Sequence, residues 1–411
     1  MFSPHIRLSL AAALLDAALL IGMTAFPFHM YDSFAGTAQT SGVIGGIQAT
    51  IYGIVCLFTG RFLARSLHPM RWGAFGILAC GTLFLLAYPQ KDLALFSVFY
   101  CTSIGMLSLT WPALHSWLGA DPDPDNRGKN MARFNMAWSA GLAVGSLAGG
   151  FIYSVHPALP FMCYFAICIL SSLLVFSLPE EGKMYDQSVR AENTEDAAYD
   201  LRGERLLLSA WIANGLAMAL AGITRLVFTK HIDDLVKAGQ LRVLFEETPP
   251  ALLSNATASQ VYAIMAFGLC LANAVAFFIM GSTRAWHHRL DVLVIVQCIA
   301  GAAVFVLGNT QSVVIMAIAF LAIGVANGAA FFAAVYYCMS NVKKRHARTS
   351  INEFAVGAGS ALGPIIAGVM MQQAGLHLTF VVIPVIVAGV VLLQCVLAAR
   401  TPHTGDATLN T

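Results

Sequence analysis

Three ionisable side chains stand inside otherwise apolar stretches of this sequence. They are Asp16 within LLDAALLIGMTAFPF, Glu353 shortly after the basic run KKRHAR, and Arg225 in a later apolar segment. An ionisable group in hydrocarbon costs at least about 2.5–3.5 kcal/mol, so each of them needs a structural or functional reason. A carboxyl group in an apolar cleft suits a group that must take up and release protons. Asp16 and Glu353 are therefore the candidates for proton coupling.

Each of these residues also has a second interpretation. Asp16 can contact a cationic part of a solute, make a helix-packing hydrogen bond, or pair with an arginine. Glu353 lies close to the basic run, which favours a gate salt bridge with Arg133 or Arg348 at the cytoplasmic mouth. Arg225 either extends its long side chain to the outer membrane surface or faces a cavity and meets an anionic group.

A second set of candidates consists of amides, aromatic rings and a histidine on the faces of apolar helices. Such groups bind neutral or amphipathic solutes by stacking and hydrogen bonding, and packing between helices explains each single residue about as well. The candidates for solute binding are Gln48, Tyr52, Trp111, His115, Asn135, Trp138, Asn214, Arg225, Asn273, Asn327 and Tyr337. His115 is also a candidate proton relay. His287 and His288 lack further ligands nearby, so no metal site and no cofactor are expected.

The elements that must position these side chains are membrane helices. Hydrophobic residues make up 58% of the 411 residues and charged residues 11%, whereas soluble domains carry roughly 25% charge. The nine cysteines all lie in apolar runs and are interpreted as small buried hydrophobes. This composition excludes a soluble globular protein, and the formal net charge of +2 gives no reason to expect nucleic acid as a partner.

A helix that crosses a bilayer needs about 20 apolar residues, and twelve such segments can be placed. The polar segment 179–204 separates the first six from the last six and is interpreted as a cytoplasmic linker. The sequence thus predicts an all-α integral membrane protein with two pseudo-symmetric six-helix bundles, at 1–178 and 205–400, and a tail at 401–411. The predicted spans are 7–30, 40–60, 70–89, 93–119, 131–153, 158–178, 205–229, 257–280, 290–308, 311–340, 349–374 and 377–399.

The two halves resemble each other most clearly in a glycine-rich segment that occurs twice, at an offset of 218 residues. Glycines four residues apart line one face of a helix with backbone, which lets another helix approach closely in lipid. The repeat therefore predicts a duplicated membrane protein in which these glycines serve helix packing. At this offset Gly141 pairs with Gly359, Gly145 with Gly363, Gly150 with Gly368, Asn135 with Glu353 and Ser146 with Pro364.

The basic residues predict the orientation. Most of the 23 lysines and arginines lie on one side if both termini are cytoplasmic, as expected for a multi-pass protein of a bacterial inner membrane. Arg65, Arg133 and Arg345 on this side are the candidate gate residues. On the opposite side, segment 231–250 is either an amphipathic helix or a solvated turn.

Twelve spans in two sets of six, a charged central linker and paired glycine-rich segments together resemble the major facilitator superfamily. The run Gly141-xxx-Gly145-Ser146-xx-Gly149-Gly150 resembles the fifth-span signature of that superfamily's proton-coupled exporters, with Ser146 where they have proline. The loop after span two keeps Gly60 and Arg65 of another family signature. Ala64 and Leu67 replace its aspartate and second glycine. The resemblance implies a rocker-type transporter with one solute site between the halves.

The predicted function is secondary active transport of a small organic solute by alternating access, coupled to protons, with export favoured over uptake. The alternative is proton-coupled or facilitated uptake of a sugar or an organic anion. A membrane-embedded transferase is a remote third possibility, because the sequence has no clustered His, Asp and Glu residues. The expected partners are the solute, protons and the lipid bilayer, and a monomer is expected.

Overall fold

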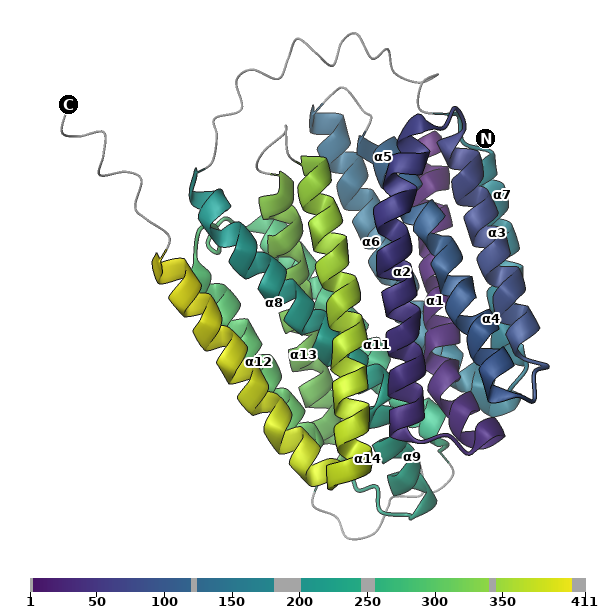
Figure 1. Ribbon diagram of the computed structural model, residues 1–411, viewed down its shortest axis with the longest axis vertical. Helices are drawn as coiled ribbons and strands as arrows, with labels where there is room; N and C mark the ends of the chain where they lie inside the picture. Colours follow the sequence, from purple (N-terminus) through teal and green to yellow (C-terminus); the bar gives the residue numbers. More distant parts are fainter. Residues whose placement is uncertain (1–2, 120–123, 181–200, 245–255, 340–344, 401–411) are drawn as a thin grey trace, which may run out of the picture.

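The computed structural model describes residues 3–119, 124–180, 201–244, 256–339 and 345–400, and these are almost entirely helical. Within them, the β-structure is one isolated bridge between Arg242 and Ser312. Both termini lie at the same end of the molecule, here called the termini end, and helix α9 lies at the opposite end, the α9 end (Figure 1). The helices are α1 (Pro4–Phe34), α2 (Ala38–Arg65), α3 (Pro69–Ala87), α4 (Leu93–Met106), α5 (Thr110–Gly119), α6 (Pro124–Val155), α7 (Leu159–Phe176), α8 (Leu201–Leu226), α9 (Phe228–Lys237), α11 (Ala258–Ser282), α12 (Leu290–Leu307), α13 (Val313–Met339) and α14 (Arg345–Arg400).

Eleven helical stretches of the described residues are long and apolar enough to cross a membrane. The last of them, Ile351–Ala399, contains two helices, because the backbone leaves the helical conformation at Gly375, which has φ 81°. Glycine reaches this left-handed region at little cost, so the chain can turn back there. The prediction of twelve membrane helices is confirmed, and the predicted break between 374 and 377 falls on Gly375.

The fourth predicted span is interrupted by a proline. It consists of α4, the short 3-10 turn Leu107–Leu109 and α5. Pro112 has no N–H, so the carbonyl of Ser108 loses the partner that an uninterrupted helix would give it. The hydroxyl of Thr59 on α2 donates to that carbonyl oxygen at 3.0 Å. The proline therefore creates an acceptor that ties this span to α2.

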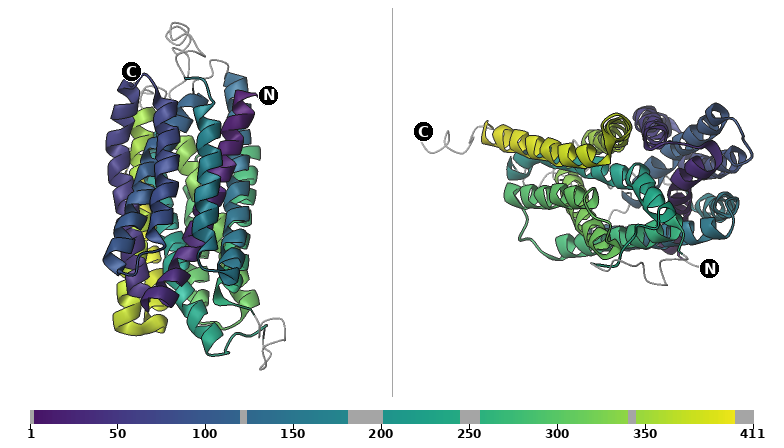
Figure 2. Two further views of the ribbon diagram at one scale, coloured as in Figure 1. Left: turned by 90° about the vertical axis from the view of Figure 1, so that its right-hand side faces the viewer. Right: turned by 90° about the horizontal axis from the view of Figure 1, so that it is seen from below.

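The helices form two groups. In the first, α1 packs on α6 and α7, and α3 on α4 and α7; in the second, α8 packs on α13 and α14, and α12 on the same two helices. The two groups lie side by side and meet where α2 packs on α14 and where α6 packs on α11 (Figure 2). Their ribbons converge at the α9 end and spread toward the termini end (Figure 1).

The repeated glycines make the same contacts in both halves. A Cβ atom on Gly145 would lie 2.7 Å from Cα of Ala17, and one on Gly363 would lie 2.7 Å from Cα of Ala219, too close for any side chain. The glycines thus bring α6 against α1 and the first part of α14 against α8. The matching contacts are Gly141 on Ala13 and Gly145 on Ala17, and Gly359 on Gly215 and Gly363 on Ala219. Helices α1 and α8 therefore correspond at an offset of 202 residues (13 to 215, 17 to 219).

The segment predicted as an amphipathic helix or a turn contains a helix, but with different bounds. Helix α9 begins at Phe228, before the predicted segment, and ends at Lys237. Its apolar residues Ile232 and Leu235 are buried, as the amphipathic interpretation requires. The extension of the helix to Leu244 is wrong, because the chain turns at Gly239 and Leu244 is half exposed. Residues 245–250 lie outside the described residues.

Candidate functional site

Asp16 lies in the middle of α1 and is 2% exposed. Its Oδ2 atom has no hydrogen-bond partner among the described residues. The close approach of α6 at Ala13 and Ala17 keeps this part of α1 inside the molecule. A buried carboxylate without a partner is costly, so this position needs a proton or a ligand to neutralise it.

Tyr52 on α2 connects Asp16 with Glu353. The Tyr52 hydroxyl is within electrostatic reach of both acids, and Cys56 lies one turn further along α2. This proximity follows from the close packing of α2 and α14, where a Cβ atom on Gly53 would lie 3.7 Å from Cα of Gly357. The structure therefore brings together three of the predicted site residues, from α1, α2 and α14.

Two asparagines connect α8 to α14 beside Glu353. Nδ2 of Asn214 donates to Oδ1 of Asn352, the residue before Glu353, at 2.9 Å. Asn214 is fully buried. Asn214, a predicted solute ligand, thus joins α8 to α14 in the present structure.

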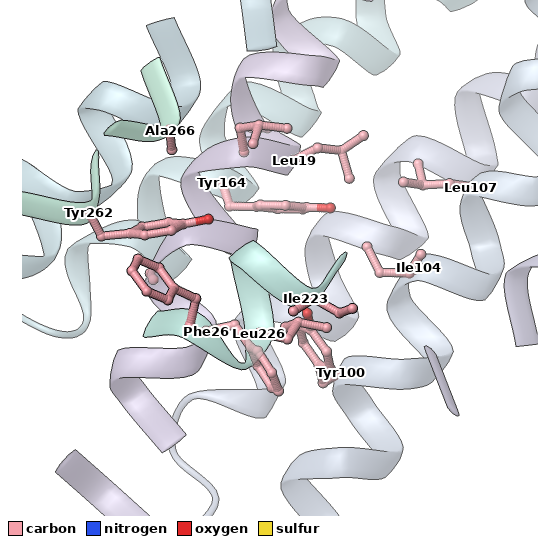
Figure 3. Packing of buried hydrophobic residues seen from close by; sticks show 14 of the residues in the cluster. Leu19, Phe26, Tyr100, Ile104, Leu107, Tyr164, Ile223, Leu226, Tyr262 and Ala266 are labelled. Atoms are coloured by element: carbon pink, nitrogen blue, oxygen red, sulfur yellow. The ribbon is translucent and has the colours of Figure 1, made fainter. Parts of the chain in front are cut away.

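Arg225 points into the molecule. Its Nη1 atom donates to Sδ of Met23 on α1 at 3.0 Å, and its charge acts on the hydroxyls of Tyr100 and Tyr262. Its neighbours on α8, Ile223 and Leu226, lie among rings from α1, α4 and α11 (Figure 3). The interpretation in which Arg225 extends to the outer membrane surface is wrong, because the packing of α8 on α14 turns this face of α8 toward α1.

The contact between Arg225 and Met23 marks the centre of the interface between the halves. At the offset of 202 residues that relates α1 to α8, Met23 corresponds to Arg225. Two residues that correspond under a twofold relation and also touch each other must lie close to its axis. The guanidinium group therefore lies near the pseudo-twofold axis.

Cys270 on α11 lies within electrostatic reach of both Asp16 and Arg225. The nearby Ser146 hydroxyl of α6 donates to the Ala143 carbonyl of its own helix at 2.9 Å. The sequence analysis missed Cys270 and Cys56 by treating all cysteines as small hydrophobes. The signal for Cys270 was its helical spacing from Tyr262 and Asn273, which places it on the face that those two residues share.

Three predicted amides are buried and have unpartnered atoms. Gln48 accepts a hydrogen bond from the Tyr100 hydroxyl at 3.5 Å, and its Nε2 atom has no partner among the described residues. Oδ1 of Asn273, which lies against Gly328, and Oδ1 of Asn327 are likewise buried without a described partner. These atoms are available to a ligand or to water.

The predicted aromatic candidates lie nearer the termini end. Trp138 on α6 stacks on Phe277 and Phe331 of the other half, at ring-centroid distances of 5.7 and 5.8 Å. His115 packs against Trp111 and Phe134, at 6.0 and 5.8 Å, and is exposed. Asn135 is also exposed. Tyr337 is not packed with them: it is buried, and its hydroxyl accepts a hydrogen bond from the His288 N–H at 3.0 Å.

Arg133, one of the two predicted partners of Glu353, does not pair with it in this structure. Arg133 is exposed, and within the described residues no ion pair joins it to Glu353. Arg65 is exposed at the end of α2, in a surface hollow lined by Phe62 and Trp72. The side chain of Arg345 lies outside the described residues.

Polar contacts join the halves at the α9 end. The hydroxyls of Tyr31 and Thr229 share a hydrogen bond at 2.9 Å, and Tyr31 also donates to the Leu226 carbonyl at 3.3 Å. Gln260 donates to Ser154 at 3.0 Å. The other two contacts are Ser259 Oγ with the Gly150 carbonyl, at 3.1 Å, and the ion pair of Asp32 with Lys237, at 3.9 Å. The α9 end is therefore closed, and residues such as Tyr31 that close it were not among the predicted ones.

The sequence matches the family model described as Major Facilitator Superfamily over residues 8–346 and 248–410. No curated protein matches the chain in sequence.

Solved structures of transporters share the fold. A mutant of the nucleoside transporter NupG has a TM-score of 0.73 and 12% identity, with 96% of this chain and 100% of that chain covered. A bacterial homolog of the human lysosomal transporter Spinster, in an inward-facing and unoccupied conformation, has a TM-score of 0.71 and 14% identity, covering 97% and 98%. A POT family transporter in complex with 5-aminolevulinic acid has a TM-score of 0.69 and 13% identity, covering 96% of each chain. Identities this low show the fold alone.

Proposed function

The chain belongs to the major facilitator superfamily, and we propose that it moves a small organic solute across the membrane by alternating access, in exchange for protons. In this proposal the moving bodies are residues 1–178 and 205–400, joined by the linker 179–204. The solute binds between them, near Asp16, Tyr52, Arg225 and Cys270. The second state would close the termini end and open the α9 end.

The observation that carries the proton coupling is the position of Asp16. It is buried between helices, has an unpartnered carboxyl oxygen among the described residues, and lies within electrostatic reach of Tyr52. Glu353 acts on the same tyrosine from the side of the termini end. We propose that protons pass between the termini end and Asp16 by way of Glu353 and Tyr52, and that a proton on Asp16 is exchanged for the solute.

The direction proposed is export, with the termini end in the cytoplasm. The basic residues support this orientation, and the exporter-like glycine pattern is used as packing against α1 at Gly141, Gly145 and Gly149. A pH difference of one unit provides about 1.4 kcal/mol per proton, which corresponds to a tenfold solute gradient. One proton per solute is therefore enough for useful export.

Transport in proteoliposomes with an imposed pH gradient tests the coupling. We expect the wild type to accumulate solute only with the gradient. Asp16→Asn, which keeps the size of the side chain, should lose this dependence and still exchange labelled for unlabelled solute without a gradient. Asp291→Asn, an exposed acid near the start of α12, is the matched control and should behave as the wild type. Equal transport by the wild type and Asp16→Asn, with and without the gradient, would show that Asp16 is not the proton site.

A further inference from the structure

We infer that Arg225 is the binding site for an anionic group of the solute, so that the transported molecule is an organic anion, with a carboxylate as its charged group. This inference rests on the proposed function and assigns its substrate class. Arg225 is partly buried, and its described hydrogen-bond contact is the thioether sulfur of Met23. A thioether is a weak acceptor, whereas a guanidinium carries five N–H donors. Most of its donors therefore remain for a ligand.

No acid within the described residues neutralises this cation at ion-pair distance. Asp16 is on the same helix as Met23, seven residues away, which corresponds to about 10 Å along the helix. Asp16 and Arg225 therefore do not form a pair, although Cys270 is within electrostatic reach of both. A partly buried cation without an ion-pair partner among the described residues favours binding of an anion there.

The position of Arg225 near the pseudo-twofold axis suits a transported anion. A group on the axis can contact α1 and α8 at once, and therefore both moving halves. It can also remain in place while the halves pivot around it to open one end and then the other. A site on the outer side of one half would lack this property, because the second half could not enclose it.

The chemistry around the guanidinium favours a carboxylate with an apolar or aromatic body. The planar fork of arginine binds a carboxylate through two parallel hydrogen bonds. The Tyr262 hydroxyl lies within electrostatic reach and offers a further donor, whereas the Tyr100 hydroxyl, also within reach, already donates to Gln48. Beyond them are aromatic rings, with Phe26 stacked on Tyr100 at 4.1 Å (Figure 3). Because Asp16 and Arg225 are separated, Arg225 binds the anion and Asp16 carries the proton.

Thermal unfolding of the purified full chain with matched probe pairs tests the inference. Each pair consists of a carboxylate and its amide: benzoate and benzamide, phenylacetate and phenylacetamide, hexanoate and hexanamide. A ligand of the folded protein raises its Tm. We expect at least one carboxylate to raise the Tm of the wild type while its amide does not. Arg225→Gln should weaken that binding at least about 30-fold, as expected when one partner of a buried charge pair is removed. If no carboxylate binds the wild type, or if amides bind equally well, the inference is overturned.

A second variant guards against loss of binding through misfolding. Because Met23 corresponds to Arg225 and touches it, the double variant Met23→Arg with Arg225→Met places the guanidinium on the opposite side of the axis. It should recover part of the carboxylate binding that Arg225→Met alone loses, whereas Met23→Leu with Arg225→Met should recover none. Failure of the exchange to recover binding, in a variant whose Tm without ligand equals that of the wild type, contradicts the axial site.

The transport assay separates this inference from the proposed function. If a neutral or cationic solute moves in exchange for protons, and Arg225→Gln moves it equally well, the inference fails and the proposed function stands. If carboxylate binding depends on Arg225 while no bound carboxylate is moved in exchange for protons, the proposed function fails and the anion site stands.

Discussion

Helices α1 and α6 in the first half, and α8 and the first part of α14 in the second, are packed in the same way but carry different chemistry. Glycines at corresponding positions lie so close to Ala17 and Ala219 that an added Cβ atom would be 2.7 Å from the neighbouring Cα in both halves. At the same 202-residue offset, however, the acid Asp16 corresponds to Met218, and Met23 to Arg225. The duplication has kept the contacts between backbones and changed the side chains that face the interface.

The pseudo-twofold axis explains why Met23 and Arg225 must differ in charge. Met23 and Arg225 touch at 3.0 Å, so charges at both positions would lie side by side in a medium of low dielectric constant and repel each other strongly. Near a twofold axis, a duplicated protein can therefore keep a given charge on one copy only. An asymmetric site also gives a solute one defined orientation, with its anion toward α8 and the proton site on α1.

The largest expected effect comes from disrupting the glycine packing that both halves share. Gly145→Ala and Gly363→Ala each place a Cβ atom against the backbone of a neighbouring helix, and overpacking of this kind costs about 1–3 kcal/mol. We expect both variants to lower the Tm of the purified protein by similar amounts. Gly389→Ala is the matched control, because its Cβ atom would have nothing within 4 Å. A large decrease in Tm for one variant and none for the other would show that the two packings are not equivalent.

An intermediate effect is expected where the copies differ near the termini end. Glu353 corresponds to Asn135, and Arg133 lies two residues before Asn135 on α6, so in a state closed at this end an acid on α14 can meet a base on α6. Glu353→Arg and Arg133→Glu should each slow transport several-fold, because a repulsive pair destabilises that closed state. The two substitutions together should recover part of the rate measured in proteoliposomes.

Arg65→Glu combined with Glu353→Arg serves as the control, since Arg65 faces a surface hollow at the end of α2. It should recover nothing. If the double variant of Arg133 and Glu353 also recovers nothing, the gate pairing is contradicted.

The helices could be predicted from the sequence because a chain in lipid must satisfy its backbone hydrogen bonds internally. Apolar length placed twelve spans, with the last break between 374 and 377. The glycine repeat predicted close packing, and Gly141 and Gly145 show it. These features depend on local composition, and a single sequence contains that information.

The site was only partly predictable, because it depends on how each helix is rotated against its neighbours. Arg225 had two interpretations until the packing of α8 at Ala219 fixed which face of the helix meets α1. Tyr337, equally plausible from its spacing, is instead turned toward the loop at His288. Cys270 was overlooked because a thiol resembles a small hydrophobe until an acid and an arginine are known to flank it.

The smallest expected effect concerns α9, which has no counterpart in the first half. Only residues 35–37 separate α1 from α2, whereas α9 lies between α8 and α11. Its Lys237 reaches Asp32 of the other half at 3.9 Å, but these side chains are 60% and 49% exposed. A pair this exposed contributes about 0–1 kcal/mol. Lys237→Ala should therefore change the population open at the α9 end less than about fivefold, as measured by spin-label distances across it.

Tyr31→Phe, which removes a buried hydrogen bond to Thr229, should change that population more. The reverse order would mean that the α9 charges, rather than the buried hydroxyls, hold this end closed.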